Sequence, residues 1–307
     1  MLVASSVDRI KTPTAIALGN FDGIHQGHQT VLQPIINFAQ PEGQPRIYPS
    51  VVSFTPHPRE FFTGKKLQLL TPTTEKKEIL AQLGIEQLIL LPFDRRLASL
   101  SPQEFVELLV VELKAKEISV GSDFRFAYQR KGTAEDLNNI AHNFGITVHI
   151  NSLHRYSNSD RSVRVSSSLI RQALSEGNIS LANTMLGRPY SLIGTVVTGQ
   201  QLGRTIGFPT ANLEVEAEKF LPRYGVYSVD VFFQQTTVKG VMNIGCRPTV
   251  AGEAPTIEVH LLNWSGDLYG QILKVDLIKF IRPEQKFASV EALKQQITED
   301  CRSVLNN

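Results

Sequence analysis

This chain of 307 residues is predicted to contain an α/β Rossmann-like domain followed by an antiparallel β-barrel with a terminal helix. Over the first half, short apolar strands alternate with amphipathic helices, which is typical of a parallel sheet flanked by helices. After about Gly187, strand-like segments follow one another without a long helix between them, which favours a small barrel. We therefore expect one domain over residues 1–186 and a second over residues 187–307.

Within the first half, expected strands cover residues 14–18, 46–54, 87–91, 118–121 and 146–150, with Pro49 interrupting the second of them. Expected helices cover residues 29–39, 74–83, 101–116, 134–144 and 169–174. Gly84 is suited to end the second helix, and a capping box from Ser101 to Glu104 begins the third. In the second half, expected strands cover residues 191–198, 225–233, 237–244, 256–262 and 272–281, and a helix covers residues 290–305.

Composition limits the classes of function. Hydrophobic residues make up 42% of the chain and charged residues 20%, as in soluble globular proteins. A net charge of +2 gives no polybasic surface for nucleic acid or an anionic membrane. Neither a signal-peptide pattern nor an apolar run of membrane-spanning length is present, and two cysteines fit a reducing compartment. We expect a cytoplasmic protein with small-molecule partners and no nucleic-acid or membrane partner; a homo-oligomer stays open.

The most informative segment is the turn of residues 19–28, which contains Asn20, Phe21, His25 and His28. It joins an apolar strand to a helix start, where backbone N–H groups can hold a phosphate. Two histidines three residues apart could instead be half of a metal site or ordinary surface residues. A zinc site would need further ligands, and Cys246 and Cys301 lie far downstream without paired spacing. Phosphate binding is therefore the favoured interpretation.

Three more segments of the first half follow predicted strands or begin a helix. His57 lies between two prolines, and the segment of residues 121–126 contains Asp123, Phe124 and Phe126. Hydroxyls of Ser166 and Ser167 precede Arg171 at a helix start, which is a favourable arrangement for an anion. Each segment alone has a structural explanation, as loop prolines, packed aromatics or a serine cap.

In the second half, glycines at positions 199, 203 and 207 permit close approach of backbone to a ligand, although a β-turn would also use them. Thr210 and Asn212 alternate along a short strand and could bind a metal ion and phosphate oxygens. Glu258 and His260 alternate on another strand, where a carboxylate suggests a catalytic base or an exposed edge residue.

Together, the four segments of the first half resemble the nucleotidylyltransferase module of bacterial bifunctional riboflavin kinase/FAD synthetases. The resemblance implies that FMN is adenylylated by ATP to FAD with release of pyrophosphate. It implies an ATP-binding set of Asn20, Phe21, His25, His28, Ser166, Ser167 and Arg171, with His28 stabilising charge as pyrophosphate leaves. It implies a flavin or nucleotide pocket formed by His57, Asp123, Phe124 and Phe126. Two positions depart from the family: Ser168 replaces a common Thr and Ala127 replaces a usual Gly.

The second half resembles the riboflavin kinase module through segments that occur in the same order, from residues 203–212 to residues 281–284. This resemblance implies phosphorylation of riboflavin to FMN by ATP with Mg²⁺. It implies that Glu258 is the catalytic base and that Arg282 contacts the flavin. It implies that Thr210 and Asn212 hold the metal ion, and that ATP is bound by Gly203, Gly207, Thr210 and Asn212. Flavins are then substrates and products. Two alternatives are a kinase whose first domain uses another acceptor or none, and a non-catalytic flavin-binding or regulatory protein that retains the fold.

Overall fold

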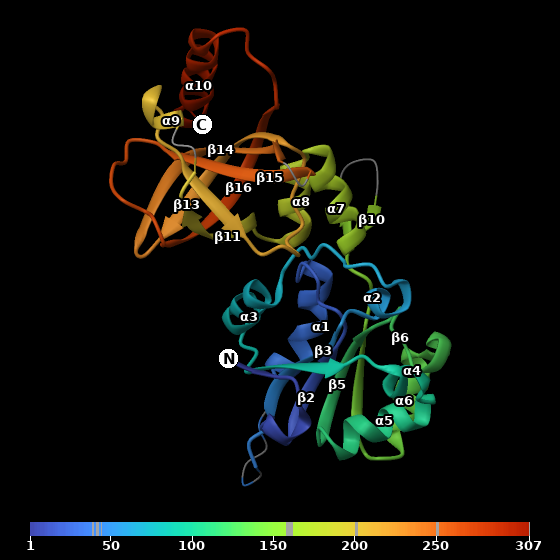
Figure 1. The fold of residues 1–307 in the computed structure, drawn as a ribbon. Helices are drawn as coiled ribbons and strands as arrows, with labels where there is room; N and C mark the ends of the chain where they lie inside the picture. The colour runs from blue at the N-terminus through green and yellow to red at the C-terminus, as the bar shows by residue number, and fades with distance from the viewer. Residues whose placement is uncertain are drawn as a thin grey trace. The chain divides into compact units, whose positions relative to one another are not determined.

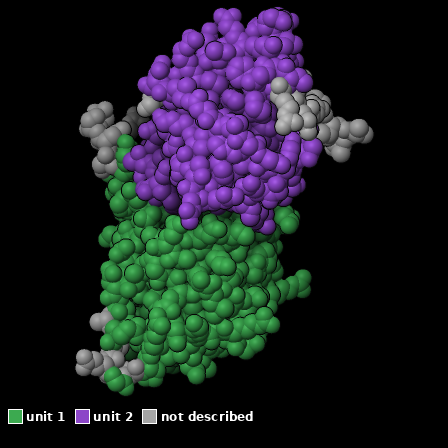
Figure 2. All heavy atoms as spheres, turned by 90° about the vertical axis from the view of Figure 1, so that its left-hand side faces the viewer, with its two compact units in different colours: residues 1–167 green, residues 168–307 purple. Residues whose placement is uncertain are grey.

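The computed structural model describes residues 1–38, 40, 43, 45–157, 162–199, 202–249 and 252–306. The chain forms two compact units, Met1–Ser167 and Ser168–Asn307, which are coloured separately in Figure 2. Among the described residues, no helix is both long enough and apolar enough to cross a membrane.

The first unit contains, within the described residues, a six-stranded sheet in the order β1-β4-β3-β2-β5-β8. Figure 1 labels β2, β3 and β5 of this sheet. All paired neighbours are parallel. The strands are β1 (Leu2–Ala4), β2 (Thr14–Leu18), β3 (Tyr48–Thr55), β4 (Gln87–Pro92), β5 (Ala115–Gly121) and β8 (Thr147–Asn151). The chain runs from β2 to β3 and β4 on one side, and then places β5 on the other side of β2. This reversal makes the carboxyl end of β2 the switch point at which such sheets bind ligands.

Helices cover both faces of this sheet because side chains of a strand alternate between its faces. Ala15 and Ala17 of β2 belong to a core with α1 (Gln26–Ile36) and α3 (Thr73–Gln82). Ile16 and Leu18 belong to a second core on the opposite face. That core includes residues of three further helices, α4 (Arg95–Ser99), α5 (Pro102–Val111) and α6 (Ala134–His142). The predicted α/β fold is confirmed.

Two details of the predicted elements are wrong. β3 continues through Pro49, because Pro49 lies one residue before the pairing of β3 with β4 begins at Ser50 and Gln87. The missing N–H of Pro49 therefore costs no bond of that ladder. The helix that begins after Ser101 ends at Val111 rather than near residue 116, and the chain already enters β5 at Ala115.

The second unit contains a closed barrel of antiparallel strands in the order β11-β12-β15-β14-β13-β16. The strands are β11 (Tyr190–Val197), β12 (Ala211–Val215), β13 (Gly225–Phe233), β14 (Thr236–Thr249), β15 (Gly252–Leu261) and β16 (Ile272–Pro283). Helix α10 (Val290–Leu305) follows β16, and its Val304 joins a small core with Val226 and Val241 of the barrel. The predicted barrel and terminal helix are confirmed.

Two helices before the barrel pack with the second unit. They are α7 (Ser167–Glu176), apart from its first residue, and α8 (Ile179–Leu186). Asn183 of α8 donates to the Leu277 carbonyl over 2.9 Å and accepts from the Tyr190 N–H over 2.8 Å, which fastens α8 to β16 and β11. The compact units thus divide the chain at residue 167, and the functional division at residue 186 stays a prediction.

Several short elements were not predicted, because segments of two to six residues show no usable periodicity. They are β1, η1 (Val7–Arg9), α2 (Pro58–Thr63), β6 (Arg125–Phe126), η2 (Tyr128–Arg130), β7 (Gly132–Thr133), β9 (Arg155–Ser157), β10 (Ser162–Arg164) and α9 (Leu202–Thr205). The longer helix α8 was not predicted either.

Candidate active sites

The histidine turn, residues 19–28, lies at the carboxyl end of β2 and leads directly into α1. Three of its residues have positive φ angles: Phe21 (+47°), Gly23 (+89°) and Ile24 (+42°). Such angles are rare for side chains other than glycine, and rarest for a β-branched residue such as Ile24. The turn is therefore held in a strained conformation by the structure around it.

His25 is the N-cap of α1, and its Nδ1 accepts the backbone N–H of His28 over 3.2 Å. The two imidazole rings are stacked, with centroids 3.7 Å apart and planes 14° apart. Phe21 contacts the His28 ring with a centroid distance of 5.2 Å. His25 is buried and His28 is half-buried. The positive end of the helix dipole and an imidazole together suit a phosphate ligand.

A set of buried polar residues supports this turn and was not predicted. Asp22 accepts the backbone N–H of Thr71 over 3.1 Å, and the Thr71 hydroxyl accepts the N–H of Gly23 over 2.9 Å. Lys76 Nζ donates to the Asn20 carbonyl over 2.9 Å. Burial lowers the pKa of Lys76, and the negative charge of Asp22 opposes that change. Nothing local in the sequence distinguishes these residues from solvated ones.

Ser167 also contacts the histidine turn. Its hydroxyl donates to the Asp22 carbonyl over 2.7 Å. Ser166 precedes it and is half-buried. Arg171 lies one turn further along α7, in the second unit, and its guanidinium lies over the Phe220 ring, 5.8 Å from the ring centroid.

The four residues expected in the flavin pocket have different structural settings. His57 Nδ1 accepts the N–H of Arg59 over 3.0 Å and caps α2. Asp123 forms an ion pair with Arg164. Phe124 stacks on Phe126 with centroids 5.7 Å apart, and Phe126 is itself buried in the core.

The departure at Ala127 has a structural consequence. Ala127 has φ +63° and ψ −172°, a region that is almost exclusive to glycine. Its methyl group therefore strains the backbone directly after β6.

An exposed aromatic cluster in the first unit was also missed. Phe61, Phe62 and Phe93 contact one another edge to face, with centroid distances of 5.3–5.8 Å. Phe62 is 71% exposed, which is high for a phenylalanine. Phe61 and Phe62 lie on α2, which His57 caps. Two adjacent phenylalanines shortly after His57 were the sequence feature from which this cluster could have been predicted.

In the second unit, a cavity of about 390 Å³ brings most of the predicted kinase residues together. Its lining includes the predicted residues Gly203, Thr210, Asn212, Glu258 and Arg282. Glu258 of β15 pairs in register with Asn212 on one side and with Asn243 on the other. A half-buried carboxylate thus lies between two amide side chains, of which Asn243 was not predicted as a site residue.

Two glycines before β12 are favoured for different reasons, Gly203 by close packing and Gly207 by its backbone conformation. A Cβ on Gly203 would lie 2.3 Å from the Phe208 carbonyl oxygen and 3.3 Å from Thr210 Oγ1. Gly207 has φ +89°, which favours glycine. The backbone at Gly203 therefore lies against the Thr210 side chain. This close approach is expected if the loop of residues 203–209 covers a ligand bound beside Thr210.

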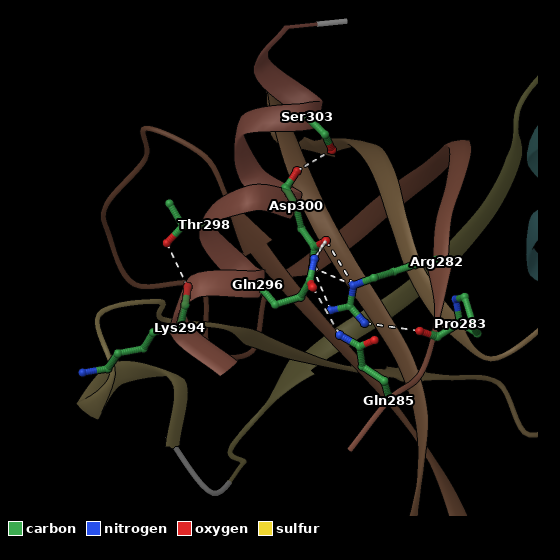
Figure 3. A network of polar contacts seen from close by, with 8 residues as sticks. All are labelled: Arg282, Pro283, Gln285, Lys294, Gln296, Thr298, Asp300 and Ser303. Atoms are coloured by element: carbon green, nitrogen blue, oxygen red, sulfur yellow. Dashed lines mark hydrogen bonds and ion pairs between the residues drawn. The ribbon is translucent and has the colours of Figure 1, made fainter. Parts of the chain in front are cut away.

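Arg282 is fixed by the terminal helix (Figure 3). Its Nε and Nη2 donate to both carboxylate oxygens of Asp300 over 2.8–3.1 Å, and Nη1 donates to the Pro283 carbonyl over 3.2 Å. Gln296 donates to the same carboxylate over 3.2 Å. Arg282 therefore joins β16 to α10, and α10 in turn contributes Leu293 and Ile297 to the cavity that holds Glu258.

A second cavity of about 720 Å³ in this unit is lined by residues including Pro209, Thr210, Trp264 and Tyr269. Thr210 lines both cavities. Two ligands bound in them would therefore meet at Thr210. Within the described ranges, no three His, Cys, Asp or Glu side chains are grouped to hold a metal ion.

Comparison with known proteins matches each half of the chain to a different enzyme family. Residues 7–169 match the FAD synthetase family and residues 186–307 match the riboflavin kinase family. A bifunctional riboflavin kinase/FMN adenylyltransferase from Escherichia coli K12 is 43% identical over 289 residues, which cover 93% of this chain and 90% of the relative. The Bacillus subtilis protein of the same name is 36% identical over 293 residues, covering 94% and 90%.

One solved structure covers the whole chain. It is titled as a macrolide-efflux protein from Streptococcus pneumoniae, with 33% identity and a TM-score of 0.87 over 100% of this chain and 99% of that one. The fold and the two sites define a two-unit transferase that handles nucleotides. The chain belongs to the family of bifunctional riboflavin kinase/FMN adenylyltransferases.

Proposed function

We propose that this enzyme converts riboflavin to FMN in its C-terminal domain, residues 187–307, and FMN to FAD in its N-terminal domain, residues 1–186. ATP, riboflavin and FMN are its small-molecule partners. The main support for the proposal is the position of Glu258 in the barrel cavity, between Asn212 and Asn243. The stacked histidines at the switch point of the parallel sheet support the second activity.

In the first step, the riboflavin hydroxyl is a weak nucleophile and benefits from removal of its proton. Glu258 accepts this proton as the hydroxyl attacks the γ-phosphorus of ATP, whose bond to the β,γ-bridging oxygen breaks so that ADP leaves. Riboflavin occupies the cavity that contains Glu258 and Arg282, and ATP occupies the neighbouring cavity, so that its phosphates lie near Thr210. Gly203 and Gly207 belong to the loop that leads to Thr210, where they approach the ATP phosphates, and Gly203 also lines the riboflavin cavity.

A magnesium ion fits the oxygen ligands beside Glu258. Thr210 supplies a hydroxyl and Asn212 an amide oxygen, and Mg²⁺ is commonly held by one or two protein oxygens together with substrate phosphates. When bound, Mg²⁺ supplies charge neutralisation to the phosphates. Thr210 and Asn212 would hold it there.

In the second step, the FMN phosphate is already a nucleophile, so that alignment and charge neutralisation suffice. His25, the N-terminus of α1 and the Asn20–Phe21 backbone contact the ATP phosphates. His28 stabilises the pyrophosphate as it leaves, and Ser166, Ser167 and Arg171 hold its oxygens. The exposed Phe62 offers a face on which the isoalloxazine ring can stack, beside the predicted pocket residues His57, Asp123, Phe124 and Phe126.

The test is incubation of the protein with riboflavin and Mg-ATP, followed by chromatographic separation of the flavins. Both FMN and FAD are expected, and finding neither refutes the proposal. His28→Ala is expected to accumulate FMN without FAD. Glu258→Ala is expected to form no FMN from riboflavin, yet to convert supplied FMN to FAD. If either variant folds and loses both steps, the assignment of one step to each domain is wrong.

A further inference from the structure

Lys76 is a buried lysine at the base of the histidine turn. It is 7% exposed, whereas the adjacent Lys77 is exposed. Burying an ammonium group is costly unless other groups replace its hydration. An apolar residue would fill this position of α3 without that cost. The cation therefore calls for a role that an apolar side chain could not fulfil.

The contacts of Lys76 lead to the catalytic histidines. Its Nζ donates to the Asn20 carbonyl over 2.9 Å, and the Ser53 hydroxyl donates to the same carbonyl over 3.4 Å. Asn20 immediately precedes Phe21, whose ring contacts His28. The Asp22 carboxylate, also buried, supplies negative charge near the ammonium.

The turn that Lys76 contacts cannot maintain its conformation by local preference. Phe21 and Ile24 both have positive φ angles, so that tertiary contacts must hold the backbone in place. Three such contacts come from one neighbouring segment: Thr71 bonds to Asp22 and to Gly23, and Lys76 bonds to Asn20. Ser53 and Ser167 add contacts from two other segments. Residues 71–76 thus stabilise the conformation of the turn through hydrogen bonds.

We propose that Lys76 is a positioning residue for adenylyl transfer, and that its ammonium fixes the Asn20–Asp22 backbone from which the stacked His25 and His28 rings are oriented. The inference rests on the proposed adenylyltransferase function of the first unit. Lys76 acts through the turn rather than on the substrate, because its Nζ is buried and donates to a main-chain carbonyl. Loss of the ammonium therefore displaces the histidines and leaves the flavin contacts unchanged.

The experiment compares Lys76→Met with Lys77→Met, a matched change at the exposed neighbour. FAD formation from FMN and Mg-ATP is measured, with riboflavin phosphorylation by the same preparation as an internal control. For Lys76→Met, kcat for FAD formation is expected to fall about 30- to 100-fold, because a misplacement of about 1 Å costs about that much. The KM for FMN and the rate of riboflavin phosphorylation are expected to stay within about twofold. Lys76→Arg, which keeps the charge, is expected to recover part of the lost kcat.

Wild-type kcat in a folded Lys76→Met variant overturns the proposal, as does an equal loss in Lys77→Met. If Lys76→Met does not fold, Lys76→Gln decides in its place, since it is also uncharged and one atom shorter than lysine. If neither uncharged variant folds while Lys76→Arg is fully active, Lys76 is a structural residue and the proposal fails. A wild-type protein that forms no FAD from FMN refutes the proposed function itself, which separates the two failures.

Discussion

Removal of the Arg282 guanidinium is expected to destabilise the second unit selectively. The side chain of Asp300 is 4% exposed and that of Arg282 is 16% exposed, and three donor–acceptor contacts of 2.8–3.1 Å join them. Arg282→Met leaves the Asp300 carboxylate buried without its cation. Breaking a buried pair in this way costs about 3–5 kcal/mol. With a urea m-value of about 2 kcal/mol/M, the unfolding midpoint should fall by about 2 M.

Unfolding of the second unit can be measured selectively by tryptophan fluorescence. Trp264 is its one tryptophan, and it packs in the second unit against Phe233 with a centroid distance of 5.4 Å. Urea unfolding followed by tryptophan fluorescence therefore reports on the barrel and not on the first unit. The KM for riboflavin should also rise, because α10 carries Leu293 and Ile297 of the cavity wall.

A double variant separates the ion pair from general damage to packing. In Arg282→Met/Asp300→Leu both charges are gone, and apolar replacement of a buried pair is often close to neutral. Its midpoint should therefore lie well above that of Arg282→Met, with a coupling energy of at least about 2 kcal/mol. Glu299→Gln, at the exposed neighbour of Asp300, is the control and should not move the midpoint. A midpoint for Arg282→Met within about 0.3 M of wild type, or additive effects in the double variant, would refute this reasoning.

Three further predictions concern single residues. Ala127→Gly should raise the stability of the first unit by about 1 kcal/mol in urea unfolding followed by circular dichroism, because it relieves a φ of +63°; a loss of stability would contradict this. Phe62→Ala should raise the KM for FMN about tenfold while leaving the kinase step unchanged, if the exposed ring stacks on the flavin; an unchanged KM would exclude that contact. Burial, and then the charge of Asp300, raise the pKa of the Cys301 thiol to about 11. The thiol thus stays mostly protonated at pH 9, and the rate of its alkylation in the native protein should keep rising until about pH 11; a rate that levels off near pH 9 would contradict this.

The sequence correctly predicted those helices and strands that are marked by a pattern within the segment itself, such as an apolar run or a capping box. The apolar run before the histidine turn is β2, and the capping box at Ser101 is the start of α5. The end of α5 was missed because it depends on distant residues. Lys114 adopts φ +47°, and Ala115 pairs with Thr14 of β2, about a hundred residues earlier in the chain. Sheet pairing thus decides where that helix must stop.

The same distinction holds for the candidate sites. His25 and His28 were found because two histidines beside glycines at a strand end form a compact pattern. Lys76 could not be found in this way, since Lys76 and Lys77 are adjacent and identical in type, and only the packing of α3 buries one of them. Asp300 was missed for a similar reason: its partner Arg282 lies on another element, and a carboxylate on a terminal helix is ordinarily solvated.

The cap at the start of α1 also determines how protons are shared between the stacked histidines. His25 Nδ1 accepts an N–H, so this nitrogen carries a lone pair and the ring is neutral with its proton on Nε2. A proton on His25 Nδ1 would break this cap, and charge on both rings would place two cations with their ring centroids 3.7 Å apart. The cap therefore fixes the role of His25 in the fold, and the proposed contact with the leaving pyrophosphate falls to His28. The two imidazoles are alike in sequence and differ in their structural roles: Nδ1 of His25 accepts an N–H at the start of α1, whereas the half-buried His28 ring is stacked on His25.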